Sequence, residues 1–283
     1  MSQPPVAADL LAVDAGNTRV KLGVFSGVAG ECVDAAAGRA LPIASPALPE
    51  PAETLAIRPG ESEQELADWL ATAGAGVGRV AVASVSAASE AAVLAGIARA
   101  ASGARVTRLA SETAPIALRV EEPARIGVDR VMAAVAANRL RHADKPAIVV
   151  DIGTAITVDL IAADGALEGG AILPGPGLAA WALAEGTGAL PTVGFGDLDA
   201  SPDAVGRSTE PAIRAGLYWG AVGAIRELIA RQRDRLTAAP QVLLTGGASP
   251  AFARLIGGPD LAVRCVPHLT LSGIAVAAAA GER

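Results

Sequence analysis

Two similar arrangements of apolar and polar residues lie about half a chain apart. In the first, the apolar residues 10–13 lead through Asp14-Ala15-Gly16-Asn17-Thr18-Arg19 to a second apolar-rich run at residues 20–25. In the second, residues 147–150 lead through Asp151-Ile152-Gly153-Thr154 to residues 156–161. Short apolar runs on both sides of a glycine-containing polar segment predict a tight β-hairpin in each half. The chain therefore contains an internal repeat of strand, Asp-x-Gly turn and strand.

The segments around the hairpins alternate between helix and strand patterns. Leu66, Trp69 and Leu70 lie on one face of a predicted helix at residues 61–72, and we expect Trp69 in the core. Strands are predicted at residues 79–85, 105–109 and 241–244, and helices at residues 88–101, 128–142, 210–235 and after residue 272. Residues 40–59 are expected to form a connector or edge structure, and residues 169–177, rich in Gly and Pro, a loop. This alternation predicts an α/β protein.

The length and the repeat favour two domains. We expect an N-terminal domain at residues 8–126 and a C-terminal domain at residues 127–283. Alternatively, the terminal helix packs back on the first domain.

Composition narrows the class of protein. The hydrophobic fraction of 52% comes chiefly from Ala, and the longest apolar run, residues 148–163, is interrupted by Asp151 and Asp159. It falls short of the roughly 18 apolar residues of a membrane span, so no membrane association is expected. Residues 1–9 lack the basic start of a secretory signal, and Cys32 and Cys265 are expected to be reduced core residues of a cytoplasmic protein. The net charge of −6 argues against nucleic acid as a partner.

The repeated hairpin suggests phosphate chemistry. Glycine at the turn lets the backbone approach a ligand, the hydroxyls of Thr18 and Thr154 can donate to phosphate oxygens, and the two Asp residues can face a cation. Lys21, one of only two lysines, lies on the outgoing strand of the first hairpin and is a candidate phosphate contact. Alternatively, the Asp residues only stabilise their turns and the lysine is solvated. P-loop, dinucleotide and zinc-protease motifs are absent from the sequence.

Asp129 is the candidate general base. It stands in Ile126-Gly127-Val128-Asp129-Arg130, where Gly allows a close turn and Arg offers a planar fork for a carboxylate. With two His and two Cys in the chain, a carboxylate is the expected base. Alternatively, Asp129 caps the predicted helix and Arg130 is a surface residue.

These motifs resemble, in order and over nearly the whole length, those of the type III pantothenate kinases, which belong to the acetate and sugar kinase, hexokinase and actin superfamily. The matching segments are Asp14-Ala15-Gly16-Asn17-Thr18 with Lys21, Gly127-Val128-Asp129-Arg130, Asp151-Ile152-Gly153-Thr154-Ala155 with Thr157 and Asp159, Gly169 to Gly175, Val205 to Thr209, Ala212 to Gly220, and Leu243-Leu244-Thr245-Gly246-Gly247.

The resemblance implies two ribonuclease-H-like (actin-like ATPase) domains with the active site in the cleft between them. It implies transfer of the γ-phosphate of ATP, with Mg²⁺, to (R)-pantothenate, which gives 4'-phosphopantothenate in the first step of coenzyme A synthesis. The implied ATP contacts are Asp14, Ala15, Gly16, Asn17, Thr18, Arg19, Val20, Lys21 and Thr154. The implied substrate contacts are Gly127, Val128, Asp129, Arg130 and Thr209, with Asp129 as the proton acceptor. Asp151 would stand near a monovalent cation, K⁺ or NH₄⁺, and Asp14 near Mg²⁺ bound through ATP.

The substrate pocket departs from the family pattern. Val120 and Glu122 occupy positions where the family often has Tyr and Asn, and Arg207-Ser208 replaces a usual Lys-Asn. A kinase for another small hydroxylated metabolite, or a non-catalytic ATP-binding accessory or regulatory protein of the same fold, remains an alternative.

The resemblance also implies a homodimer in which Thr209 of one subunit reaches the pantothenate site of the other. The helix at residues 210–235 is apolar along Ile213, Leu217, Val222 and Ile225, with Gly216, Gly220 and Gly223 and the aromatic residues Tyr218 and Trp219. Aromatic residues are enriched at interfaces, so this helix is the expected dimer surface. Alternatively, the apolar stripe packs within its own domain.

Overall fold

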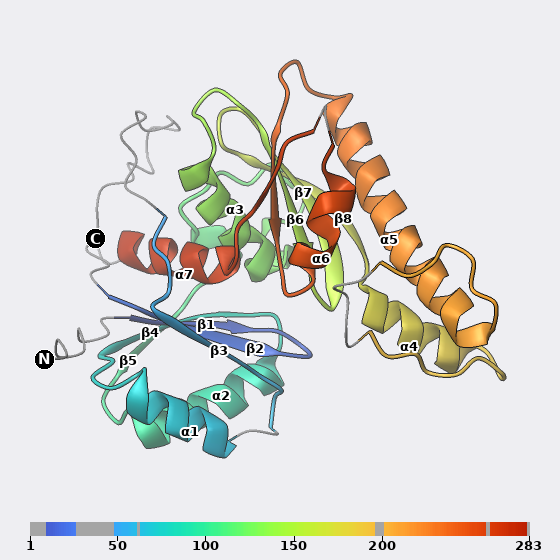
Figure 1. Cartoon of the computed structure of the whole chain (residues 1–283). Coiled ribbons are helices and arrows are strands. Elements are labelled where there is room, and N and C mark those ends of the chain that lie inside the picture. The colour runs from blue at the N-terminus through green and yellow to red at the C-terminus, as the bar shows by residue number, and fades with distance from the viewer. Residues whose placement is uncertain (1–9, 27–47, 61–62, 196–200, 259–260, 282–283) are drawn as a thin grey trace, which may run out of the picture. The chain divides into compact units, whose positions relative to one another are not determined.

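The computed structural model describes residues 10–26, 48–60, 63–195, 201–258 and 261–281 (Figure 1). The chain divides into two compact units. The first contains residues 1–143, 164–167 and 268–283, and the second contains residues 144–163 and 168–267.

The first unit contains a five-stranded mixed sheet. The strand order is β3-β2-β1-β4-β5, in which β2 is antiparallel to β1 and β3, and β4 is parallel to β1 and β5. The strands are β1 (Leu10–Ala15), β2 (Val20–Phe25), β3 (Glu53–Ile57), β4 (Arg79–Ser84) and β5 (Arg105–Arg108). Because side chains alternate across a strand, β1 directs Leu11 and Val13 into one layer and Asp14 to the opposite face.

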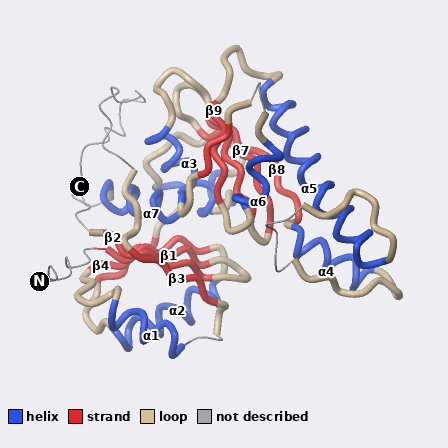
Figure 2. The backbone as a smooth tube through the Cα atoms, in the orientation of Figure 1, coloured by secondary structure: helices blue, strands red, loops and turns tan. Residues whose placement is uncertain are grey.

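Helices cover both faces of this sheet (Figure 2). Helices α1 (Glu63–Thr72) and α2 (Ala87–Ala100) pack on the face of Leu11 and Val13, and Leu66 and Ile97 join the same core. Helix α7 (Leu269–Ala280) lies on β1, β2 and β4 on the other face and packs closely against α3 (Val128–Leu140), which also contacts β4. Two short 3₁₀ helices, Ser111–Thr113 and Pro123–Arg125, precede α3.

The second unit contains a five-stranded sheet with the order β8-β7-β6-β9-β10, which corresponds strand by strand to the order in the first unit. Here β6 is antiparallel to β7 and parallel to β9, which is parallel to β10. The elements are β6 (Ala147–Ile152), β7 (Ala155–Ile161), β8 (Leu167–Pro174), α4 (Pro176–Gly186), α5 (Thr209–Arg233), β9 (Gln241–Thr245), α6 (Ser249–Ile256) and β10 (Val263–Cys265). Helices α5 and α6 share a core with one face of the sheet, and α4 lies against α5 (Figure 1). The predicted α/β class and the internal repeat are confirmed.

The unit boundary differs from the predicted division after residue 126. Helix α3 belongs to the first unit because its nearly continuous burial is against α7 and β4. Helix α7 belongs to the first unit as well, so the chain returns to its first sheet after completing the second. The packing of the terminal helix on the first domain was one of the two alternatives expected from the sequence. The placement of α3 was not expected, because a local sequence pattern does not reveal partners that are far apart along the chain.

Several local predictions need correction. The predicted loop at residues 169–177 is largely the edge strand β8, whose burial alternates from residue to residue. Tyr218 is 1% exposed inside the second unit, and Trp219 donates its ring N–H to the Pro202 carbonyl, so they do not form an exposed aromatic surface. Trp69 is only partly buried. Cys265 is exposed, and Cys32 lies outside the described residues.

No helix in the described part of the chain combines the length and the apolar character needed to cross a membrane.

Candidate active site

The first hairpin places an ion pair across two neighbouring strands. Asp14 and Lys21 are directly opposite in the β1–β2 register, and Lys21 Nζ lies 3.7 Å from Asp14 Oδ2. Directly opposed side chains on one face of a strand pair are close enough to interact. Asp14 is 8% exposed, while the Lys21 side chain is 34% exposed. The lysine charge therefore compensates a nearly buried carboxylate and still reaches solvent.

The turn of this hairpin divides the predicted ATP contacts into two groups. The Gly16 N–H donates to the Arg19 carbonyl at 3.1 Å, which closes the turn, and Asn17, Thr18 and Arg19 are exposed. Ala15 and Val20 are instead buried in the core with α1 and α2. Their side chains cannot touch a ligand, so only the turn residues, Asp14 and Lys21 offer side chains.

The second hairpin has the same design with a shorter turn. Asp151 is half-buried and stands opposite Thr157 on β7, and the Gly153 N–H donates to the Ala155 carbonyl at 3.0 Å. Thr154 is exposed at the tip of the turn. The register position that Lys21 occupies in the first hairpin is therefore taken here by the uncharged residue Thr157.

Two glycines pack directly against this second hairpin. A Cβ on Gly175 would lie 2.2 Å from the Gly153 carbonyl oxygen, and a Cβ on Gly246 would lie 2.4 Å from Asp151 Oδ1. Gly246 also has a φ of +93°, which favours glycine. The Gly-Pro-rich segment and the Thr-Gly-Gly segment of the sequence thus have a shared physical basis: both supply backbone that approaches the turn too closely for any side chain.

Asp129 lies in the first turn of α3. Its Oδ1 accepts a hydrogen bond from the Arg130 N–H at 2.9 Å. Among the described residues, Oδ2 has no hydrogen-bond partner, and the side chain is half-buried. The N-cap residue of α3 is Gly127, so Asp129 is not the cap itself, and its bond to the next N–H uses only one of its two carboxylate oxygens.

The residues before Asp129 fix the direction of its carboxylate. A Cβ on Gly127 would lie 2.4 Å from Asp129 Oδ1, so the bare glycine makes the room that this oxygen occupies. Val128 is 6% exposed and packs inward, so it offers a ligand only backbone atoms. Arg130 is half-buried beside them.

Residues 118–122 are anchored on the β7–β8 turn. Arg119 forms a two-pronged ion pair with Asp164, and its N–H donates to the Leu167 carbonyl at 2.8 Å. The hydrogen bond from Arg119 holds the pKa of Asp164 below its usual range. Val120 is half-buried, and Glu122 is exposed and paired with Arg125 at 2.7 Å. The Arg119–Asp164 pair could not be predicted from a local sequence pattern, because its partners lie 45 positions apart.

His268 is a second residue that the sequence did not single out. It has a left-handed φ of 59° at the start of α7. Burial lowers the pKa of His268, and the positive charge of Lys21 lowers it further, against the opposing effect of Glu50. A histidine with a depressed pKa therefore lies within the electrostatic reach of the first hairpin.

Thr209 is the exposed first residue of α5 in the second unit. Asp14, Lys21 and Asp129 belong to the first unit, and Asp151, Thr154 and Thr209 belong to the second. Within the described residues, no three acidic, histidine or cysteine side chains gather into a metal site.

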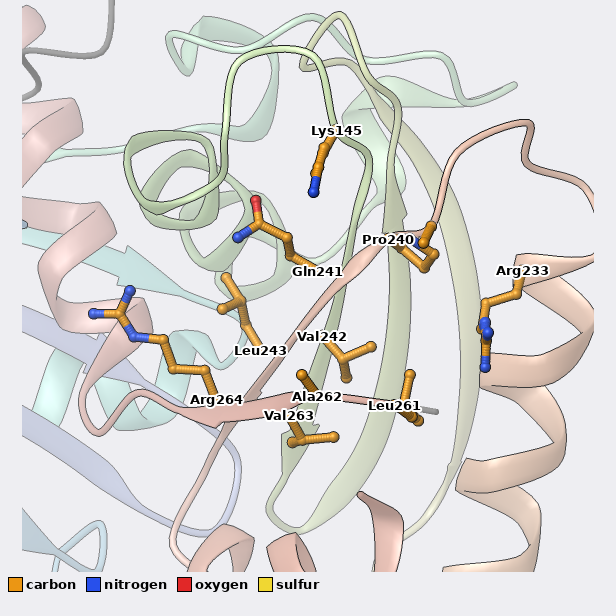
Figure 3. A pocket seen from close by; sticks show the side chains of 11 residues that line it. Lys145, Arg233, Pro240, Gln241, Val242, Leu243, Leu261, Ala262, Val263 and Arg264 are labelled. Carbon is orange, nitrogen blue, oxygen red and sulfur yellow. The ribbon is translucent and has the colours of Figure 1, made fainter. Parts of the chain in front are cut away.

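A pocket of about 340 Å³ opens at the start of β9, beside β10 and the end of α5 (Figure 3). Its lining includes none of the predicted site residues. Lys145, Arg233 and Arg264 supply positive charge, but Arg233 and Arg264 point in different directions (Figure 3). Their charges do not converge on one ligand position.

The sequence of the chain matches one known family over most of its length. The sequence pattern of the type III pantothenate kinases matches residues 10–231. The chain belongs to the type III pantothenate kinase family. The family resemblance inferred from the motifs is thereby confirmed, and the matched region contains both hairpins and Asp129.

Relatives with the same family name are similar over part of their length. The type III pantothenate kinase of Acidiphilium cryptum is 40% identical over 159 residues, which are 56% of each chain. That of Gluconobacter oxydans is 41% identical over 155 residues, which are 55% of this chain and 54% of the relative. The chain spans about half the length of these curated relatives.

Solved structures support the fold. The ethanolamine utilization protein EutJ from Carboxydothermus hydrogenoformans superposes with a TM-score of 0.52 at 18% identity, over 97% of this chain and 91% of that one. The activator of the 2-hydroxyisocaproyl-CoA dehydratase from Clostridium difficile, with bound ADPNP, gives a TM-score of 0.51 at 12% identity, over 96% and 94%. At such identities the likeness of this type III pantothenate kinase family member extends to fold alone.

Proposed function

We propose that the protein transfers the γ-phosphoryl group of ATP to the primary hydroxyl of (R)-pantothenate, which yields 4'-phosphopantothenate and ADP. The observation that carries this proposal is Asp129 at the start of α3, with Oδ1 held by a backbone N–H and Oδ2 without a described partner. Family membership supports the choice of substrate.

In the proposed reaction Asp129 accepts one proton. Oδ2 accepts the proton of the pantothenate hydroxyl as the hydroxyl oxygen forms its bond to the γ-phosphorus. The bond from that phosphorus to the β–γ bridging oxygen breaks, and ADP leaves with the electron pair. Because the phosphoryl transition state depends mainly on positioning and electrostatics, the base contributes only part of the acceleration, roughly 10²–10⁴-fold.

The two hairpins bind the phosphates of ATP in this proposal. The exposed Thr18 and Thr154 hydroxyls donate to phosphate oxygens, and Lys21 reaches them from its pairing with Asp14. In this proposal the backbone of the turn residues 16–19 contacts the phosphates as well. Arg130 binds the pantothenate carboxylate, for which its planar guanidinium is suited.

The carboxylates fit hard cations. Asp14 is nearly buried beside a lysine, which suits contact with Mg²⁺ through the nucleotide, because Mg²⁺ usually keeps its waters and phosphate ligands. Asp151 is a half-buried carboxylate at the second hairpin, and the resemblance to the family implies a K⁺ or NH₄⁺ ion near it. These ions would supply charge neutralisation for the polyphosphate.

The test is ADP release at fixed ATP with and without (R)-pantothenate, together with detection of the phosphorylated product by mass spectrometry. We expect pantothenate-dependent ADP release, and a loss of 10²-fold or more in Asp129→Asn with the ATP affinity retained. Release that ignores pantothenate but responds to another hydroxylated metabolite would favour the alternative kinase. ATP binding without turnover on any acceptor would favour an accessory protein.

The cation assignment has its own measurement. Activity with Mg²⁺ in a sodium-only buffer should be low and should recover on adding K⁺ or NH₄⁺ at matched ionic strength. Equal activity in all three salts would remove the role proposed for Asp151.

We also propose that the active unit is a homodimer formed through α4 and α5. The apolar side chains Ile213, Val222 and Ile225 pack inside the second unit, so the predicted stripe itself is not available. The opposite-facing Gly216, Gly220 and Gly223 are exposed, and a Cβ on any of them would meet nothing within 4 Å. Trp181 of α4 is 55% exposed beside this helix pair.

A mixture of two inactive variants tests the dimer. If Thr209 completes the site of the other subunit, a heterodimer of Asp129→Asn and Thr209→Val contains one site with both defects and one with neither. Activity should then reappear after subunit exchange. Heterodimers that form and remain as inactive as their parents would show that Thr209 does not act across an interface.

A further inference from the structure

Helices α3 and α7 of the first unit cross in backbone contact at Gly273. A Cβ on Gly273 would lie 1.8 Å from the Met132 carbonyl oxygen and 2.6 Å from its carbonyl carbon. Both are backbone atoms, so no side-chain rotation can make room. Real Cβ contacts are almost never shorter than 3.0 Å, and any larger residue at 273 therefore separates the two helices by more than 1 Å.

Helix α3 is the partner that must move. Helix α7 rests directly on β1, β2 and β4, and its residues from Leu269 to Ala278 are all buried. Helix α7 therefore cannot move away from α3, because the sheet lies directly behind it. Helix α3 is itself buried continuously from Val131 to Ala137. Because closely packed interiors transmit strain, we expect a displacement at Met132 to shift the neighbouring residues of the helix as well.

The displacement of α3 at Met132 affects Asp129, the candidate base, because the two residues lie within one helical turn. Met132 follows Asp129 by three residues, and residues three apart lie on neighbouring positions of one helix face. The backbone contact at Met132 thus defines where the first turn of α3 stands relative to the sheet that carries Asp14 and Lys21.

We propose that Gly273 is a positioning residue for Asp129: by allowing α7 to touch the α3 backbone, it places the carboxylate at its working distance from the substrate hydroxyl. This inference rests on the proposed function of Asp129. Gly273 lies outside residues 10–231, to which the family pattern extends. A misplacement of about 1 Å can cost on the order of 10²-fold in rate.

Gly273→Ala tests the proposal against a matched control in the same helix. Leu271 is 1% exposed and faces β2, where its Cδ1 would lie 3.2 Å from a Cβ on Gly23. Leu271→Ala therefore weakens the seat of α7 on the sheet and adds nothing toward α3. We expect a kcat about 10²-fold lower in Gly273→Ala with the KM for ATP within threefold, and a kcat within threefold of wild type for folded Leu271→Ala.

A double-mutant cycle separates positioning from general damage. In the Asp129→Asn background, Gly273→Ala should cause little further loss of kcat, because the misplaced group is already inactive. A full additional loss would overturn the proposal, as would wild-type kcat in the folded Gly273→Ala protein. If Gly273→Ala does not fold, Met132→Ala removes a fully buried side chain from α3 three residues after Asp129, and its kcat should fall about tenfold, again only when Asp129 is present.

Amide hydrogen exchange supplies a readout that does not need turnover. Residues 128–132 should exchange faster in Gly273→Ala, or in Met132→Ala in its place, than in Leu271→Ala, and equal exchange would overturn the proposal. A wild-type protein that releases no ADP with pantothenate would contradict the proposed function instead, so the two failures are distinguishable.

Discussion

Replacing Gly127 by Ala should reduce activity while leaving the fold at least as stable. Gly127 has φ −56° and ψ 126°, a conformation that alanine adopts without strain. At such a position, Gly→Ala typically stabilises a protein by about 0.4–1 kcal/mol, because it restricts the unfolded chain. A loss of activity in a stabilised protein would therefore not arise from misfolding.

The size of the effect follows from the contact with Asp129. The new Cβ would lie 2.4 Å from Oδ1, whereas real contacts below 3.0 Å are essentially absent and ordinary contacts begin at 3.4 Å. The carboxylate must therefore shift by about 0.6–1.0 Å. Since about 1 Å of misplacement can cost on the order of 10²-fold, we expect kcat to fall about 10- to 100-fold, or roughly 1.4–2.7 kcal/mol in barrier.

The measurement pairs urea unfolding with the pantothenate-dependent ADP assay. Gly78→Ala is the control, because its Cβ would meet nothing within 4 Å. It should show the same gain in stability with unchanged kcat. If Gly127→Ala is folded and turns over within threefold of wild type, the carboxylate position seen here is not the one used in the reaction.

Three further outcomes are expected. Gly246→Ala should lower the free energy of unfolding by at least 1–2 kcal/mol, because it combines a positive φ with a clash against the second hairpin, whereas Gly247→Ala should be nearly neutral in urea unfolding. The lowered pKa of His268 means that the folded protein favours the neutral imidazole. The free energy of unfolding should therefore be constant above the ordinary histidine pKa of about 6.5 and should decrease as the pH falls from that value toward the lower pKa of the folded state. His268→Asn should flatten this part of a plot of Tm against pH. Tyr218→Phe should cost about 1 kcal/mol in thermal unfolding, because a buried hydroxyl bonded to the Ala251 carbonyl at 3.3 Å is removed, and an unchanged Tm would contradict that bond.

The hairpins could be predicted from the sequence because their signals are local. Apolar runs flank each Asp-x-Gly, and the register then places Asp14 opposite Lys21. The α/β alternation was local in the same sense, since helix and strand periods differ.

Features that depend on distant partners could not be predicted in this way. Strand β8 was assigned to a loop because of its Gly and Pro content, yet Gly170 is glycine because a Cβ there would lie 2.2 Å from the Val158 carbonyl oxygen of β7. The expectation that Tyr218 lies on a dimer surface was also wrong, because the same apolar pattern along a helix results from packing on a sheet and from packing on a second subunit. The crossing at Gly273 left no sequence signal, since both helices are rich in Ala.

The return of α7 to the first sheet has a consequence for the order of events during synthesis. A ribosome releases β1 to β5 and α3 early, but α7, which packs against α3 and rests on β1, β2 and β4, emerges only after the second unit has been made. Domains usually fold in the order in which they are synthesised. Here the strands and helices of the second unit are complete before α7 is made, and until then the part of β1, β2 and β4 that α7 covers stays exposed. The nascent chain is therefore most exposed to aggregation and chaperone binding at its oldest end.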